Sequence, residues 1–277
     1  MDKERYIFEK FSDKKNGDDG ALVGKWVFSK DLFVQNIHFK RSWLSLRQIA
    51  VKSMLVNISD AVAMNARPKY ALLGLELPKE ISVSEIDELC GGFLDICKKF
   101  NIKIIGGDTI SGDRISISVT IISKTKKAVF RKGAKIGDFI AFTGNLGSVI
   151  KDFEILENGG KIDKNSKFIT PDLKADFFYK AAKFTTSAMD ISDGLSQDLL
   201  RLLEKNGAGI KFLKNLSKDE LFSGEEYEIL FTFAKKNRDK ILKIAKKTAT
   251  KITIFGEIAE LSVDTKFIDL SKKHHFE

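Results

Sequence analysis

The chain has 277 residues, of which 43% are hydrophobic, so it can bury a full core and two domains are the starting expectation. The formal net charge is +9, but lysine pairs such as Lys98-Lys99 and Lys246-Lys247 are spread over predicted helix faces, which disfavours a nucleic-acid surface. Neither a membrane span nor the apolar core of a signal peptide is evident, so the sequence predicts a cytoplasmic protein whose partners are neither nucleic acid nor membrane.

Strand and helix signals alternate through the first half of the chain. A long helix is expected from about Leu44 to Met64, closed by Ala66-Arg67-Pro68. Four segments have the composition of strands: 21–29, which runs into Asp31, 71–77, 102–105 and 115–121. This half is therefore expected to be α+β or α/β with a mixed sheet.

A second helix in this half is predicted between residues 86 and 100, where apolar side chains recur on one helical face. Ser84 and Asp87 supply a plausible capping box at its start. Cys90 and Cys97 lie seven residues apart on this helix, and we expect both to pack in the core of a protein from a reducing compartment.

A basic, turn-rich segment from Lys126 to Asp138 is the expected domain boundary, giving domains of 1–135 and 136–277. The second half repeats the mixture of elements. Its expected strands are 139–143, 227–233 and 251–255, and its expected helices are 146–157, 195–205 and 238–247.

Acidic residues recur where a predicted strand or helix meets a turn, several of them beside glycine. They are Asp18-Asp19, Asp31, Asp60, Asp108, and Asp190 with Asp193. Any one of them alone is more simply a turn former or a helix cap. Together they indicate a magnesium site, because Mg²⁺ takes hard oxygen ligands and glycine lets the backbone approach a phosphate.

The usual phosphate-binding and nucleophile signatures are absent from the sequence. It contains neither a Walker-type loop nor a dinucleotide-binding glycine fingerprint, and it has no protein-kinase catalytic loop, nucleophile elbow or Cys/His metal spacing. Metal-assisted chemistry by carboxylates is what remains.

Seven short motifs occur in one order along nearly the whole chain. They are Asn16-Gly17-Asp18-Asp19, Ser29-Lys30-Asp31 followed by Asn36-Ile37-His38-Phe39, Val56-Asn57-Ile58-Ser59-Asp60, Gly106-Gly107-Asp108-Thr109, Arg131-Lys132-Gly133-Ala134-Lys135-Ile136-Gly137-Asp138, Asp190-Ile191-Ser192-Asp193-Gly194-Leu195 and Ser223-Gly224-Glu225-Glu226-Tyr227-Glu228. In these motifs the chain resembles the thiamine-monophosphate kinases, a family in the superfamily that includes aminoimidazole ribonucleotide synthetase. Seven ordered motifs are far more specific than any single one.

The resemblance implies the two-domain α/β (α+β) fold of that superfamily, a homodimer whose amino-terminal mixed-sheet domains form a barrel, and ATP bound with several Mg²⁺ ions. It implies a metal shell of Asp18, Ser29, Asp31, Asp60, Asp108, Asp190 and Asp193, to which Lys30 would contribute its backbone. It implies ATP contacts from Gly107, Asp108, Arg131 and Ser192, and thiamine monophosphate contacts from His38 and Glu225. By residue type alone, His38 would instead be a structural histidine and Arg131 a solvated charge.

The implied reaction moves the γ-phosphoryl group of ATP directly onto thiamine monophosphate, giving thiamine diphosphate and ADP. No catalytic general base is expected, because a phosphate monoester is mostly dianionic at neutral pH. Two alternatives stay open: another ATP-dependent enzyme of the superfamily, such as the ribonucleotide synthetase, and an inactive homologue that binds nucleotide and metal.

Three features depart from the family pattern. Lys30 stands where Thr or Ser is usual, and Ser223 and Glu226 replace the usual Gly and Asp, so the substrate loop is expected to differ in shape. Near the carboxyl end, Leu270 and Lys273 stand where aromatic residues are usual, which leaves the residue that stacks on the thiazole ring open.

Overall fold

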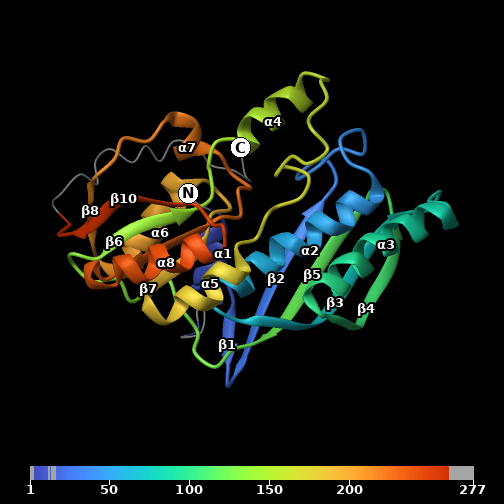
Figure 1. Ribbon diagram of the computed structural model, residues 1–277. Coiled ribbons are helices and arrows are strands. Elements are labelled where there is room, and N and C mark those ends of the chain that lie inside the picture. Colours follow the sequence, from blue (N-terminus) through green and yellow to red (C-terminus); the bar gives the residue numbers. More distant parts are fainter. Residues whose placement is uncertain (1–2, 12, 14–16, 262–277) are drawn as a thin grey trace.

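The computed structural model describes residues 3–11, 13 and 17–261 and contains two five-stranded sheets with helices packed on them (Figure 1). The strand orders are β1-β2-β5-β3-β4 and β7-β9-β6-β10-β8. The expected fold class, α/β with a mixed sheet in the first half, is confirmed. The carboxyl-terminal segment with Leu270 and Lys273 lies outside the described residues.

The first sheet is mixed because β3 and β4 run parallel whereas its other neighbouring strands are antiparallel. Its strands are β1 (Ala21–Val23), β2 (Trp26–Val34), β3 (Arg67–Pro78), β4 (Lys103–Gly112) and β5 (Ser116–Lys124). Along β5, residues 117, 119 and 121 are buried while their neighbours are half-exposed, as the sequence alternation predicts. Helices α2 (Leu46–Ala63) and α3 (Val83–Phe100) cover one face of this sheet (Figure 1).

The opposite face of the first sheet is open in the single chain. It exposes apolar side chains from three of its strands: Phe28, Leu32, Leu72 and Ile110. An exposed apolar surface on a sheet of this kind marks an interaction surface.

Helix α2 lies at the centre of the molecule. It begins with a capping box in which Ser45 and Gln48 bond each other's backbone, and 14 of its 18 residues are buried. Besides the first sheet and α3, it contacts β7 and α5 of the second half. A helix that is apolar on nearly every side is buried on every side, so α2 ties the two halves together.

The second sheet is antiparallel throughout. Its strands are β6 (Phe139–Thr143), β7 (Thr185–Asp190), β8 (Gly209–Phe212), β9 (Ile229–Phe233) and β10 (Ile252–Ala259). The accompanying helices are α4 (Val149–Glu157), α5 (Ala175–Ala181), α6 (Leu195–Asn206), α7 (Lys218–Phe222) and α8 (Arg238–Lys247), and α1 (Lys3–Lys10) precedes the first sheet. Short 3₁₀ turns span 182–184 and 235–237.

One hydrophobic cluster continues from the first half into the second, joining Phe33 and Ile58 to Phe177 and Phe231. The last strand of the first sheet ends at Lys124, and the first strand of the second begins at Phe139. The proposed division after residue 135 falls in the segment between them, although the two units share a packed core.

Several sequence expectations differ from the structure, among them the single strand over 21–29, which is instead β1 and β2 with a turn between them. The capping box of α3 is formed by Ser82 and Glu85 instead of Ser84 and Asp87, because Ser82 has the extended backbone that a helix cap requires. Cys97 is buried but Cys90 is exposed, since it lies on the edge of the apolar stripe. The strand expected to end before Gly106 continues as β4 to Gly112.

A further difference is a set of elements that the sequence did not predict, chiefly β7, β8 and α5. The buried end of β7 is Ser187-Ala188-Met189-Asp190, which has neither a branched apolar run nor alternation. It is a strand because β9 supplies its backbone hydrogen bonds.

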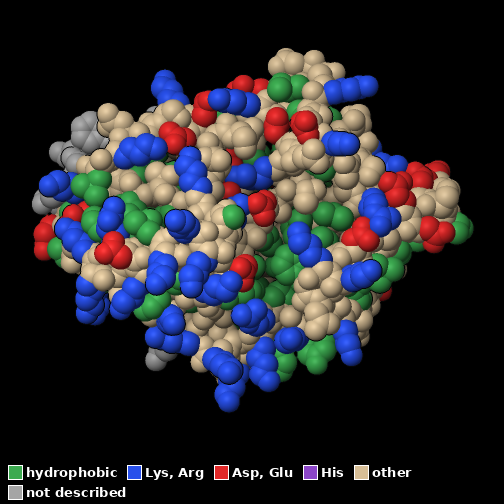
Figure 2. Space-filling model, in the orientation of Figure 1, with side chains coloured by type: hydrophobic (Ala, Val, Ile, Leu, Met, Phe, Trp, Pro, Cys, Tyr) green, Lys and Arg blue, Asp and Glu red, His purple; other side chains and the backbone are tan. Residues whose placement is uncertain are grey.

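Lysine and arginine side chains are spread over the visible face of the molecule, most densely over α5 and α8 (Figure 2). Acidic groups are interspersed among them (Figure 2). Within the described residues, every helix is too short or too polar to cross a membrane.

The capping box of α3 gives a direct stability test. Ser82 Oγ accepts a hydrogen bond from Glu85 N at 3.3 Å, and the Glu85 carboxylate accepts one from Ser82 N at 2.9 Å. Ser82→Ala should lower the free energy of unfolding by about 1 kcal/mol and the Tm by about 2–4 °C. Thermal unfolding followed by circular dichroism measures this, with Ser84→Ala as the matched control. An equal loss in both variants would contradict the assignment of Ser82 as the cap.

Candidate functional site

Three aspartates from separate parts of the chain meet in one place, Asp190 buried and the other two partly buried. Asp19 comes from the turn before β1, Asp60 from the last turn of α2, and Asp190 from the end of β7. A carboxylate oxygen of each lies within 4.8 Å of the others. Asp31, on β2, hydrogen-bonds to Asp60 and extends the group to four. Both halves of the chain therefore contribute to a single acidic site.

Burial makes these carboxylates hard to ionise. It is the main cause that raises the pKa of Asp60 and Asp190 well above the ordinary value, and the neighbouring aspartates raise both further. Burial also raises the pKa of Asp31 to about 6, opposed by its hydrogen bond to Asp60. Like charges at this spacing need a cation to be stable together at neutral pH.

Arg131 supplies part of that positive charge. Its Nε and Nη2 donate to Asp19 Oδ1 at 2.9 and 2.5 Å. Burial nevertheless raises the pKa of Asp19, and its other oxygen, Oδ2, is buried without a hydrogen-bond partner among the described residues. An orphaned carboxylate oxygen beside two more carboxylates fits a divalent cation with oxygen ligands.

The sequence predicts Asp18 for the metal shell, whereas in the structure its neighbour Asp19 is the residue that lies with Asp60 and Asp190. Asp18 Oδ1 instead accepts a hydrogen bond from the Arg131 backbone N at 2.7 Å. In a turn, adjacent side chains point in different directions, so the motif alone could not choose between Asp18 and Asp19.

Alternation along β2 separates Ser29 and Asp31 from Lys30. Ser29 is buried on the α2 side, where its hydroxyl donates to Asn57 Oδ1 at 2.6 Å. Lys30 points to the open face and donates to Ser118 Oγ at 2.5 Å. The Lys30 side chain therefore points away from the acidic site. Only the backbone of Lys30, between Ser29 and Asp31, can lie next to that site.

Ser59 is a site residue that the sequence reasoning did not assign. Its hydroxyl donates to Asp190 Oδ2 at 2.8 Å, which joins α2 to β7. The signal available was its place inside the motif that ends at Asp60.

The loop after β7 carries Ser192 and Asp193, both expected at the site. Asp193 pairs with Arg201 of α6, and the fully buried Asp198 accepts hydrogen bonds from the backbone N of Ser192 and Asp193 at 3.0 and 3.1 Å. Burial, together with the charge of Asp193, raises the pKa of Asp198 to about 7. Asp198 and Arg201 thus shape this loop, a role that needs tertiary contacts to be seen.

Gly107 and Asp108 lie apart from the acidic group within one chain. Gly107 is in line with Asp31 across the sheet but three strands away, which corresponds to ~14 Å. Asp108 aligns with Leu32 and so faces the open side, where it is exposed. Gly107 itself has φ +155°, and a Cβ there would lie 1.8 Å from the Leu73 carbonyl oxygen, so only glycine fits.

His38 and Glu225, the expected substrate residues, are linked by packing. His38 Nδ1 accepts a hydrogen bond from Val34 N at 3.1 Å, and its ring lies 5.5 Å from that of Phe33. Lys52 Nζ lies 5.8 Å from the Phe33 ring and forms an ion pair of 2.7 Å with Glu225 Oε2. Lys52 is a second residue that the sequence reasoning missed.

The two substituted residues of the substrate loop interact with each other. Ser223 Oγ donates to Glu226 Oε1 at 2.6 Å and accepts from Ile150 N at 3.0 Å. Glu226 Oε1 also accepts from Gly147 N at 2.7 Å, at the start of α4, and its other oxygen pairs with Lys167 at 2.8 Å. The longer Glu226 carboxylate and the added Ser223 hydroxyl therefore cap α4, whose own Ser148 makes no side-chain cap.

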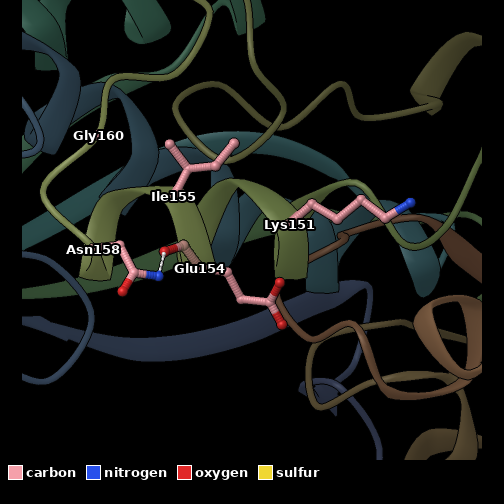
Figure 3. Close-up of a pocket in the computed structure, with 5 residues that line it drawn as sticks. All are labelled: Lys151, Glu154, Ile155, Asn158 and Gly160. Atoms are coloured by element: carbon pink, nitrogen blue, oxygen red, sulfur yellow. Dashed lines mark hydrogen bonds between the residues drawn. The ribbon is translucent and has the colours of Figure 1, made fainter.

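A shallow pocket on α4 is unconnected with these residues. It is lined by Lys151, Glu154, Ile155, Asn158 and Gly160, and Asn158 Nδ2 donates to the Glu154 carbonyl oxygen across its end (Figure 3). None of the expected site residues lines it.

Comparison with known proteins places this geometry in a family. The profile described as "AIR synthase related protein, N-terminal domain" matches residues 17–125. The thiamine-monophosphate kinase of Buchnera aphidicola subsp. Schizaphis graminum is 33% identical, covering 93% of this chain and 88% of the relative. That of Aquifex aeolicus is 28% identical, covering 94% of this chain and 92% of the relative.

Solved structures agree with the sequence comparison. The structure described as "AaThiL complexed with AMPPCP and TMP" is 27% identical and superposes with a TM-score of 0.83, covering 93% of this chain and 89% of that one. A HypE-HypF complex, 19% identical with a TM-score of 0.77, shares the fold. On its sequence identity, its coverage and its ordered motifs, the chain belongs to the thiamine-monophosphate kinase family.

Proposed function

We propose that the chain transfers the γ-phosphoryl group of ATP to the phosphate of thiamine monophosphate, giving thiamine diphosphate and ADP. The observation that carries this proposal is the convergence of Asp19, Asp60 and Asp190 with an unpartnered carboxylate oxygen, in a chain of this family. The described ATP-analogue complex of AaThiL supports ATP as the co-substrate.

The acidic group would hold Mg²⁺, the proposed cofactor. Asp19, Asp31, Asp60 and Asp190 are the residues we assign to it, with Ser29 and the Lys30 backbone adjoining them on β2. Bound there, Mg²⁺ would neutralise phosphate charge. The chain's own contribution is to keep four oxygen ligands close together before any ligand arrives, with Asp193 on the neighbouring loop.

Charge is the main obstacle to this reaction. Two phosphate groups must approach in line, and each pair of unit charges at about 4 Å costs about 4 kcal/mol at an effective dielectric constant near 20. Arg131 lies beside Asp19, and its guanidinium group is suited to the triphosphate, to which we also assign Ser192. No general base is required, since the acceptor phosphate is already largely ionised at neutral pH.

His38 and Glu225 are the residues we assign to thiamine monophosphate. The Glu225 carboxylate is about one-quarter exposed at its side chain, and its backbone N bonds Ser192 O at 2.7 Å. A carboxylate in this position would attract the cationic thiazolium ring, while Ser192 connects the same loop to the acidic site.

We further infer that the open face of the first sheet packs against a second copy of the chain. Phe28, Leu32, Leu72 and Ile110 make it apolar, and a homodimer would cover them. Asp108 lies on this face and Gly107 precedes it on β4, far from the other aspartates of the same chain, so a site that uses them would require the dimer.

The function can be tested by a coupled ADP-release assay with ATP, Mg²⁺ and thiamine monophosphate. Asp31→Asn should reduce turnover by at least about 100-fold, because a neutral amide removes one charge from the acidic site. Asp113→Asn, in the exposed turn after β4, is the matched control and should retain wild-type turnover. Wild-type rates in Asp31→Asn would show that the proposed site is wrong.

Magnesium should stabilise the protein more as the pH rises. The folded pKa of Asp31 is about 6 against an ordinary value of 3.8, so between these values the folded state holds a proton that the unfolded state releases. Stability from this group without metal is present below that window and is lost as pH rises through it. The increase in Tm on adding Mg²⁺ should therefore be larger at about pH 8 than at about pH 5.

Asp19 and Asp18 form a matched pair for the same measurement. Asp19→Asn should remove at least about half of the Tm increase given by Mg²⁺, whereas Asp18→Asn should keep most of it. If Asp18→Asn loses more of the Mg²⁺-dependent Tm increase than Asp19→Asn does, Asp18 and not Asp19 is the metal ligand.

Leu32→Asp should convert the proposed dimer to a monomer, because it places a charge in the middle of the covered face. Sedimentation velocity measures the outcome. Leu94→Asp, on α3, is the control, since Leu94 is 62% exposed and Leu32 is 59% exposed. A monomeric wild-type protein would exclude the proposed dimer.

A further inference from the structure

We propose that Lys52 is a positioning residue for Glu225, holding its carboxylate where thiamine monophosphate binds. This inference rests on the proposed function. It assigns a task to a lysine that no motif pointed to, and it explains how the amino-terminal half controls a substrate residue of the carboxyl-terminal half.

Lys52 lies on α2 and is fully buried. Its Nζ contacts one carboxylate, Glu225 Oε2 at 2.7 Å, and lies over the ring of Phe168 at 3.9 Å and near that of Phe33 at 5.8 Å. Lysine is almost never fully buried unless it is paired, because taking an ammonium group out of water is costly. The ion pair with Glu225 and the two aromatic faces are therefore what keep Lys52 in place.

Glu225 has a backbone that needs such support. Its φ is +54° and that of Tyr227 is +50°, which side-chain-bearing residues rarely adopt. The loop is held by bonds of 2.7 Å from Glu225 N to Ser192 O and of 2.8 Å from Tyr227 N to Ile191 O. These bonds fix the backbone relative to the loop after β7, but they leave the Glu225 side chain free to rotate.

The Lys52 contact removes that freedom. One oxygen of Glu225 is bound to Lys52, whose side chain is fully buried and packs against the ring of Phe168. The same lysine approaches Phe33, whose ring lies against His38. Contacts from Glu225 through Lys52 and Phe33 to His38 thus set the distance between the two proposed substrate residues. A fixed distance lowers the entropy cost of binding the substrate.

A purely structural role for Lys52 makes a different prediction. If Lys52 only joined the two halves, replacing it would lower the stability of the protein and the amount of folded enzyme. The enzyme molecules that still fold would keep their affinity for thiamine monophosphate. A positioning role predicts a selective change in the KM for thiamine monophosphate.

Steady-state kinetics with both substrates varied would test the proposal on Lys52→Met, Lys52→Arg, Glu225→Gln and the double variant Lys52→Met/Glu225→Gln. Lys52→Met should raise the KM for thiamine monophosphate by about 10-fold while the KM for ATP changes by less than about 2-fold. Lys52→Arg should recover part of the loss. The double variant should be no worse than the poorer single variant, because both changes remove one interaction.

Lys40→Met is the matched control. Lys40 also bridges the two halves, by a 2.9 Å pair with Glu157 on α4, but this pair is exposed and touches neither substrate residue. It should leave both KM values unchanged. Equal effects of Lys40→Met and Lys52→Met, or multiplying effects in the double variant, would overturn the proposal.

Hydrogen exchange at residues 223–228 provides a readout that does not depend on activity. Lys52→Met and Glu225→Gln should both speed exchange there, and Lys40→Met should not. If wild-type protein fails to turn over thiamine monophosphate, the proposed function falls while this measurement still decides whether Lys52 holds the Glu225 loop. Unchanged exchange in both variants would exclude the positioning role. If Lys52→Met does not fold, Glu225→Gln tests the same pair from its half-buried side.

Discussion

Mutual repulsion among buried carboxylates is the constraint on which the arrangement of this molecule depends. Four carboxylates are held close together and away from water, those of Asp19, Asp31, Asp60 and Asp190. Loss of hydration and the charges of the neighbouring aspartates raise the pKa of each. Such a group persists only if the surrounding structure keeps it together. Because the four carboxylates repel one another in the absence of a cation, binding a cation there is favourable.

Helix α2 provides most of that surrounding structure. It carries Asp60 and Ser59 in its last turns and Lys52 two turns earlier, and it is enclosed by both halves of the chain. Because the hydrophobic cluster is continuous from Phe33 to Phe231, movement of one half relative to the other would expose apolar surface. The acidic site and the Glu225 loop are therefore positioned by the same packed helix.

Buried ion pairs organise the loop that carries Glu225 and Glu226. The two adjacent carboxylates bind different lysines, Lys52 and Lys167, which belong to opposite halves of the molecule. The substitutions at Ser223 and Glu226 are compatible with this, since the new hydroxyl and the longer side chain bond each other and the start of α4. The two residues that depart from the family pattern, Ser223 and Glu226, therefore form a hydrogen-bonded pair in the structure.

The sequence by itself determined the family, the fold class, the long helices and the positions of Asp31, Asp60 and Asp190, because these depend on local periodicity and on motifs contiguous in the chain. It could not show that Asp19 and not Asp18 lies with Asp60 and Asp190, or find the contacts of Ser59, Asp198 and Lys52, because each of these depends on a partner more than four residues away. It also could not separate Asp108 from Asp31, since strand order and pleat decide which face a side chain occupies. Only the tertiary structure decided these points, because direction, burial and pairing are properties of the packed chain.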